Sequence, residues 1–137
     1  MKRVVRTGGS ISAYVWDIYG GGLPTEPFHK ELRAMNIDYP LPPSAEVSKL
    51  DMLETVWIEA GLSEIETKKI SVQRTFASFD DFWNISTRSP TLTPVLANWS
   101  HEEIDRFKPL VARHLKTEAN GQIRCFGHAN AVKGFVQ

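Results

Sequence analysis

Arg3-Val4-Val5-Arg6-Thr7-Gly8-Gly9-Ser10-Ile11-Ser12-Ala13-Tyr14-Val15-Trp16-Asp17 is the stretch that decides the fold of this chain. Its double glycine predicts a turn, because glycine enters positive φ without a clash at Cβ. The next residues alternate with the period of two that is typical of a strand, with Ile11, Ala13 and Val15 on one face and Ser12, Tyr14 and Trp16 on the other. Since both faces carry bulky side chains, we expect both to be covered, as in the interior of an α/β sheet.

The segments around this strand are predicted as helices and loops. Met1–Val5 reads as the last turn of a helix. A second helix is predicted from Thr25 as cap, with Pro27 in its first turn. Its apolar face is expected to contain Phe28, Leu32 and Met35. It ends before a proline-rich loop at residues 36–43, and loops of this kind can also cover a ligand.

The best-defined helix is predicted from Ser48 to Ala60. Ser48 and Asp51 have the spacing of a capping box, and Gly61 stands where a helix ends in the left-handed conformation. The apolar stripe of this helix is Leu50, Leu53, Val56, Trp57 and Ala60. A strand over residues 62–76 follows, with Ile70 and Val72 on its inward face, and its central charges predict an edge strand.

The last third of the chain predicts two capped helices and a long strand. Ser78 caps a helix whose apolar cluster is Phe79, Phe82 and Trp83. Ser100 and Glu103 form a capping box that opens the longest helix, which Pro109 is expected to kink or divide. After a turn at Asn120-Gly121, the last strand runs over residues 122–136, and Gly127 and Gly134 are read as bends in it.

Composition favours a single domain over residues 1–137 in the cytoplasm. Sixteen basic and sixteen acidic residues give a net charge of zero, so no nucleic-acid partner is expected. The one cysteine, Cys125, excludes an intrachain disulfide and fits a reducing compartment. No apolar run approaches the roughly 20 residues that a spanning helix needs, so no membrane partner is expected either.

Three motifs together resemble the C-terminal part of a class I S-adenosylmethionine-dependent methyltransferase. Within that class, the resemblance is to the type 11 methyltransferases. The first motif is Arg6-Thr7-Gly8-Gly9, with Thr7 where proline is usual, followed by a strand that ends in Val15-Trp16-Asp17. The second motif is the segment from Leu53 to Leu62, and the third is Ala129-Asn130-Ala131-Val132-Lys133-Gly134. The resemblance covers nearly all of the chain but only the second half of the family. It implies a partial Rossmann-like sheet of three main strands in the order first, third, second, with the last strand antiparallel and helices on both faces.

The cofactor-binding half of that family has no counterpart in this sequence. The family holds S-adenosylmethionine with a glycine-rich turn after its first strand and an acidic residue after its second. The triplet Gly20-Gly21-Gly22 follows the wrong strand and lacks the spacing of a phosphate-binding loop, so it is read as a hinge or a substrate-side loop. We therefore expect no S-adenosylmethionine bound to this chain alone and assign no catalytic or cofactor residue.

By the resemblance, this half supplies a wall for a small-molecule substrate. Ligands of open α/β sheets lie beyond the carboxyl ends of the strands, which predicts Trp16, Asp17 and Tyr19 at the mouth of the site. The other candidates are Glu26, His29, Phe82 and Trp83. The alternative interpretation is that the aromatic residues at helical spacing are core residues.

No other constellation predicts chemistry. The four histidines, His29, His101, His114 and His128, have no zinc-ligand spacing, so no metal site is expected. Cys125 and His128 would lie on opposite faces of one strand, which is poor geometry for a nucleophile and its base. A buried, inert Cys125 is the better interpretation.

Two functions remain open. The chain is either a piece of a methyltransferase that acts on a small molecule only when its missing half is supplied, or a non-catalytic stand-alone module for dimerisation or small-ligand binding. Either way, the strand over residues 11–15 would normally have a neighbour on one side. We expect its exposed edge to bind a second copy, as a homodimer, or the missing methyltransferase half. Whether Met1 is a natural start or a truncation is left open.

Overall fold

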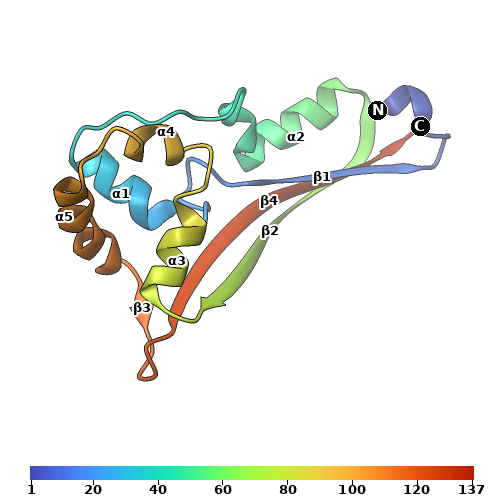
Figure 1. Ribbon diagram of the computed structural model, residues 1–137. Coiled ribbons are helices and arrows are strands. Elements are labelled where there is room, and N and C mark those ends of the chain that lie inside the picture. Colours follow the sequence, from blue (N-terminus) through green and yellow to red (C-terminus); the bar gives the residue numbers. More distant parts are fainter. The chain divides into compact units, whose positions relative to one another are not determined.

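The predicted first strand is strand β1, Ser10–Trp16, and it follows a turn in which Gly8 has a φ of 78°. A 3-10 helix, η1 (Lys2–Val4), precedes this turn, in agreement with the helical turn predicted there. The computed structural model describes all 137 residues, and Figure 1 shows the order of the elements. The remaining strands are β2 (Leu62–Phe76), β3 (Lys116–Thr117) and β4 (Ile123–Val136).

The strand order of the sheet is β1-β4-β2, and β3 pairs with β4. β4 runs antiparallel to β1, with Ser10 opposite Phe135 and Trp16 opposite Ala129. This confirms the predicted order of first, third, second strand and the antiparallel last strand. In this order β1 and β2 are the two edge strands of the β1-β4-β2 part of the sheet, and an edge position was predicted for β2. The chain is therefore an α/β protein with a four-stranded sheet.

The chain divides into two compact units. The first contains residues 1–23, 43–72 and 127–137, and the second contains residues 24–42 and 73–126. Each unit has a hydrophobic cluster of its own. The prediction of one domain over the whole chain stays a prediction.

The core of the first unit lies between α2 (Leu50–Glu59) and one face of the sheet. Its buried residues are Ile11, Leu53, Trp57, Val132 and Val136. The indole nitrogen of Trp57 donates a hydrogen bond of 3.3 Å to the carbonyl oxygen of Ile11. A Cβ on Gly134 would lie 2.9 Å from Cδ1 of Trp57 and 3.1 Å from Cβ of Leu62. Close approach of Trp57 therefore accounts for this glycine, which the sequence analysis read as a bend.

The opposite face of β1 is open, so the prediction that both faces are covered was wrong. Tyr14 is 80% exposed and Trp16 is 38% exposed, whereas Ile11 is buried. Ile70 and Val72 of β2 are also exposed, although the sequence analysis placed them on the inward face. The error has one physical cause: alternation identifies the two faces of a strand but does not say which of two bulky faces meets a helix. Within this unit α2 covers one face only, so the predicted helical cover on both faces is absent here.

The second unit is a helical cluster around aromatic side chains. Its helices are α1 (Glu26–Ala34), α3 (Phe79–Ser86), α4 (Thr93–Leu96) and α5 (His101–Ala112). Phe28 and Phe82 stack at 5.4 Å between ring centroids, and both are fully buried. The predicted inward residue Met35 is exposed, because α1 ends at Ala34 and Met35 already lies at its C-cap.

Two of the four predicted helix caps are made. Ser78 accepts from the amide of Asp81, and Ser100 forms a complete capping box with Glu103. Thr25 lies at the N-cap of α1 without a capping hydrogen bond, and the predicted Ser48 box is absent. Instead Ser48 ends a 3-10 helix, η2 (Ala45–Ser48), and α2 begins two residues later. Pro109 lies inside α5 without dividing it.

Replacing Gly134 tests the packing of Trp57 on the sheet. We expect Gly134→Val to lower the free energy of unfolding by about 1–3 kcal/mol, because the new side chain overlaps Trp57 in a packed core. Ala131→Val is the matched control on the half-exposed face of the same strand, and its effect is expected within about 0.5 kcal/mol. Urea denaturation measures both, and equal effects would contradict this account of Gly134.

Candidate functional site

The predicted substrate residues of the first unit lie at the carboxyl end of β1. Trp16 is the last residue of the strand, Asp17 is buried, and Tyr19 is half exposed. The ammonium group of Lys49 lies 4.8 Å from the centre of the Tyr19 ring, which is a cation–π distance. The structure places these three residues at one end of the sheet, and their position at the mouth of a substrate site stays a prediction.

Asp17 is the centre of a polar cluster that consists of Asp17, Lys69 and His128. Its Oδ2 lies 3.2 Å from Nε2 of His128 and 3.6 Å from Nζ of Lys69. Its Oδ1 accepts a 3.0 Å hydrogen bond from the amide of Gly20. Both carboxylate oxygens thus have partners inside the protein, and Asp17 orders the strand end rather than presenting a carboxylate to solvent.

The glycine triplet folds around this carboxylate. The amide of Gly22 donates to the carbonyl of Asp17 at 2.7 Å, and the amide of His128 donates to the carbonyl of Gly22 at 3.0 Å. A Cβ on Gly20 would lie 2.2 Å from Oδ2 of Asp17, and one on Gly22 would lie 2.2 Å from the carbonyl oxygen of His128. Close backbone contact with β4 and Asp17 therefore explains these glycines, without any role in holding a phosphate.

Ser48 and Asn130 continue the polar region next to the Asp17 cluster. The hydroxyl of Ser48 accepts from the amide of Ile18 at 3.2 Å, and its carbonyl accepts from the side-chain amide of Asn130 at 2.8 Å. This use of Ser48 explains why the predicted capping box fails: the hydroxyl orders the segment after β1 instead of the helix. Asn130 is buried and its Oδ1 has no hydrogen-bond partner.

An apolar hollow of about 510 Å³ lies on the other face of the same strands. We call it the β1 hollow; it is lined by Tyr14, Val15, Trp16, Ile70, Val72 and Ala129. Trp16 is opposite Ala129 in the register, and the next pair is Asp17 with His128. Because side chains alternate along a strand, the hollow and the Asp17 cluster face opposite sides of the sheet. A ligand in the hollow would therefore not reach the carboxylate of Asp17.

The candidates of the second unit are core residues by their packing. Phe82 is fully buried and Trp83 is 8% exposed. The Trp83 ring lies 5.2 Å from Phe28 and 6.2 Å from Phe107, measured between ring centroids. These contacts fit the alternative that the sequence analysis kept for aromatic residues at helical spacing.

His29 is fully buried on α1. Its Nε2 lies 3.1 Å from the hydroxyl of Thr91, its ring stacks on Tyr39 at 4.4 Å, and its Nδ1 has no hydrogen-bond partner. Burial lowers the pKa of His29 to about 4, so the imidazole is neutral at physiological pH. Glu26, in the first turn of the same helix, pairs with Arg33.

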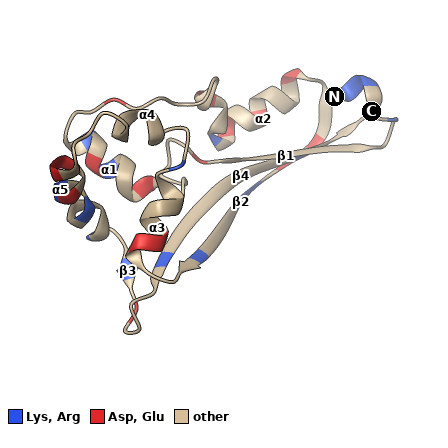
Figure 2. Cartoon of the chain, in the orientation of Figure 1, with Lys and Arg blue, Asp and Glu red and all other residues tan.

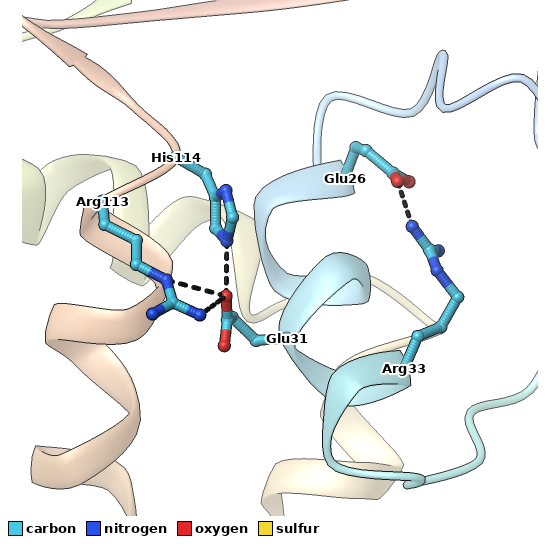
Figure 3. Close-up of polar contacts among 5 residues, drawn as sticks. All are labelled: Glu26, Glu31, Arg33, Arg113 and His114. Atoms are coloured by element: carbon cyan, nitrogen blue, oxygen red, sulfur yellow. Dashed lines mark hydrogen bonds and ion pairs between the residues drawn. The ribbon is translucent and has the colours of Figure 1, made fainter.

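Sequence reasoning missed a buried carboxylate in the second unit. Figure 3 shows Glu31 of α1 between Arg113 and His114 at the end of α5. Glu31 is 3% exposed, and its Oε1 accepts from Nε and Nη2 of Arg113 at 3.1 and 2.8 Å and contacts Nε2 of His114. Burial alone would raise the pKa of Glu31, but the hydrogen bonds from His114 and Arg113 outweigh it and lower the pKa. Its position one residue before Leu32, on the buried stripe of α1, was the available signal.

Cys125 is buried, as predicted, and its Sγ lies 3.0 Å from the carbonyl oxygen of Pro24. Burial raises the pKa of this thiol, which disfavours the reactive thiolate. No group of three or more His, Cys, Asp or Glu side chains is arranged to hold a metal ion. No helix has the length and apolar character that would let it cross a bilayer.

Comparison with known proteins gives a distant structural likeness. No family model matches the chain, and no curated protein matches it. Among solved structures, it is similar to a candidate methyltransferase of Bacillus halodurans, with 17% sequence identity and a TM-score of 0.37. The match covers 98% of this chain and 54% of that one, so the chain spans about half the length of this neighbour. A likeness at this level assigns neither a family nor an activity.

The Glu31 cluster predicts a pH-dependent stability. Because folding lowers the pKa of Glu31, its contribution is present above the ordinary value of 4.5 and is lost as the pH falls through the lowered value. We expect Glu31→Gln to reduce the free energy of unfolding by roughly 1.5–3 kcal/mol at pH 6, the range for hydrogen bonds to a charged group. The difference from the parent protein should shrink as the pH falls below 4.5.

Glu26→Gln on the same helix is the control. Its partner Arg33 is half exposed, so the loss should stay under about 1 kcal/mol. Urea denaturation from pH 3 to pH 7 measures both variants. A Glu31→Gln effect that is independent of pH would contradict the assignment.

Proposed function

We propose that this chain is the acceptor-side portion of a S-adenosylmethionine-dependent methyltransferase that acts on a small molecule, and that it is inactive without a cofactor-binding portion. The observation that carries this proposal is the strand order β1-β4-β2 with β4 antiparallel to β1. Strands that follow one another in sequence are usually neighbours, so β2 would be the default neighbour of β1. The resemblance of the sequence to the methyltransferases implied the insertion of the last strand instead.

The chain's own residues do not fit the cofactor. When bound, S-adenosylmethionine supplies the methyl group, and its nucleotide part needs a glycine-rich turn and an acidic residue on the ribose. The triplet Gly20-Gly21-Gly22 is the candidate for such a turn, and its Gly20 and Gly22 are packed against Asp17 and the backbone of His128. This supports the need for a second portion of the enzyme.

What this portion would contribute is the position of the acceptor. Methyl transfer is largely a matter of alignment, so a wall that orients the acceptor is a sufficient role. Trp16 and Tyr19 are the residues best suited to it, because both are at least partly exposed at the carboxyl end of β1. Asp17 would act on the loop at residues 17–22 and only indirectly on the acceptor.

Calorimetric titration with S-adenosylmethionine tests the need for a second portion. We expect no heat of binding with this chain alone, and micromolar binding would contradict that part of the proposal. The upstream DNA is then read for an in-frame glycine-rich turn. If one is found, the longer polypeptide should bind the cofactor and transfer methyl groups, whereas a promoter at that place favours the stand-alone module. A longer polypeptide that binds it no better than this chain would count against the methyltransferase assignment.

In that longer protein, Trp16→Ala should raise KM for the acceptor about tenfold, because a partly buried aromatic contact of about 1.4 kcal/mol is lost. Ile58→Ala is the control, since Ile58 is an exposed apolar residue of α2. Steady-state kinetics at saturating cofactor distinguish the two. Equal effects of both substitutions would remove Trp16 from the acceptor site.

A second candidate is a non-catalytic assembly module, and the β1 hollow favours it. Ligand sites of this size usually combine an apolar wall with a few convergent polar groups. The hollow is lined by apolar and aromatic residues, and apart from the Tyr14 hydroxyl and the Trp16 indole N–H its side chains offer no polar group. Such a surface is suited to contact with protein.

A further inference from the structure

The two edges of the sheet differ in charge. β1 carries no charged residue and no proline between Ser10 and Trp16, whereas β2 carries Glu64, Glu66, Lys68, Lys69 and Arg74. Figure 2 shows this contrast as a tan β1 and a β2 with charged positions. Proteins commonly protect an edge strand from pairing with charges, prolines or bulges. β2 has charges of this kind, and β1 has neither charges nor proline.

The backbone groups that β1 presents at its edge follow from its pairing with β4. In an antiparallel pair, alternate residues bond to the partner strand and the residues between them point away. Asp17 and Gly9 both bond to β4, through His128 at 3.1 Å and Val136 at 2.8 Å. The odd-numbered residues therefore bond to β4. The N–H and C=O groups of Ser10, Ser12, Tyr14 and Trp16 point to the edge.

We propose that two copies of this chain pair through β1, antiparallel and related by a two-fold axis at Ala13. In this register Ser10 lies opposite Trp16 of the second copy, and Ser12 lies opposite Tyr14. All four edge-facing residues of each copy then form hydrogen-bonded pairs. The odd-numbered residues form the intervening pairs, with Ile11 opposite Val15 on the α2 face and Ala13 at the axis.

The sizes of the side chains on β1 favour antiparallel pairing of this strand with a second copy of itself. The serines occupy one half of the exposed face of β1, and Tyr14 and Trp16 occupy the other half. Antiparallel pairing places each large side chain next to a small one, whereas parallel pairing in register would place Tyr14 beside Tyr14 and Trp16 beside Trp16. The small Ala13 at the axis permits the close approach of a pair without hydrogen bonds.

The charges of the chain also favour a second copy as the partner of the β1 edge. The chain has a net charge of zero, so two copies do not repel each other at long range. The same two-fold pairing of β2 about its middle would bring Lys68 and Lys69 of both copies together, which is unfavourable. The inference uses only the residues of β1 and β2, so it stands or falls independently of the methyl-transfer proposal.

Sedimentation equilibrium at micromolar concentration gives the first test. We expect the mass of two chains, 15.5 kDa each. A monomer at these concentrations overturns the proposal, and so does a dimer that fails the two tests that follow.

Disulfide trapping tests the register. Ala13→Cys places two thiols across the axis, where Cα atoms of a pair without hydrogen bonds are about 4.5 Å apart, within disulfide range. We expect covalent dimers on mild oxidation. Ser10→Cys is the matched control on the same edge, since its two copies would be about six residues apart along the strands and should not cross-link. The native Cys125 is buried and present in both variants. Cross-linking of Ser10→Cys instead of Ala13→Cys overturns the register.

Substitutions that weaken the dimer distinguish pairing through the edge of β1 from contact through the apolar face of the sheet. Ser12→Pro removes an N–H that points to the edge and leaves the ladder to β4 intact, so the dimer Kd should rise roughly tenfold or more, as one hydrogen bond is lost in each half. Ser12→Lys is the second variant if the proline variant does not fold: it keeps the N–H but places two like charges on neighbouring strands near the axis, which should also raise Kd. Val72→Lys, in the β1 hollow but on β2, should change Kd less than about twofold. Dissociation by Val72→Lys with no effect at Ser12 would show that the apolar face is the contact and would overturn the proposal.

Discussion

The antiparallel pairing of β1 with β4 is the constraint on which the first unit depends. It joins Ser10–Trp16 to residues 129–135, which lie at the far end of the chain. This pairing creates the face that Trp57 covers beside Gly134, and it brings His128 to Asp17 at the strand end. Without it, neither the small core under α2 nor the closed loop at residues 17–22 would have a partner strand. Local propensity alone would not produce either feature.

The sequence predicted the helices and strands better than it predicted which of their faces are buried. The strand after Gly8-Gly9, the caps at Ser78 and Ser100, and the uncommon strand order all agree with the structure. The first two depend on signals within a few residues, and the strand order came from a resemblance to a family. The failures at Tyr14, Ile70 and Val72 concern which side of a strand meets a helix, which depends on residues far away in the chain.

The sequence also did not predict the hydrogen bonds that polar residues make with partners far away in the chain. Ser48 has the local pattern of a cap, but its hydroxyl and carbonyl bond to Ile18 and to Asn130. Glu31 is of a residue type that is usually solvated on a helix, but it lies on the buried stripe of α1 and is paired with Arg113. In both cases a tertiary contact outweighs the local preference. A polar residue on a buried stripe is therefore worth marking before a structure is known.

The same distinction decides which aromatic residues still need a functional explanation. Trp83 and Phe82 contact other aromatic rings in the core of the second unit, and this burial accounts for their presence without any ligand. Tyr14 and Trp16 lie on the open face of an uncharged edge strand, where burial within the chain explains neither. Exposed aromatic residues of this kind are costly to leave in water and are enriched where another surface covers them. The end and the edge of β1 are thus where both proposals, a bound acceptor and a second chain, place a partner.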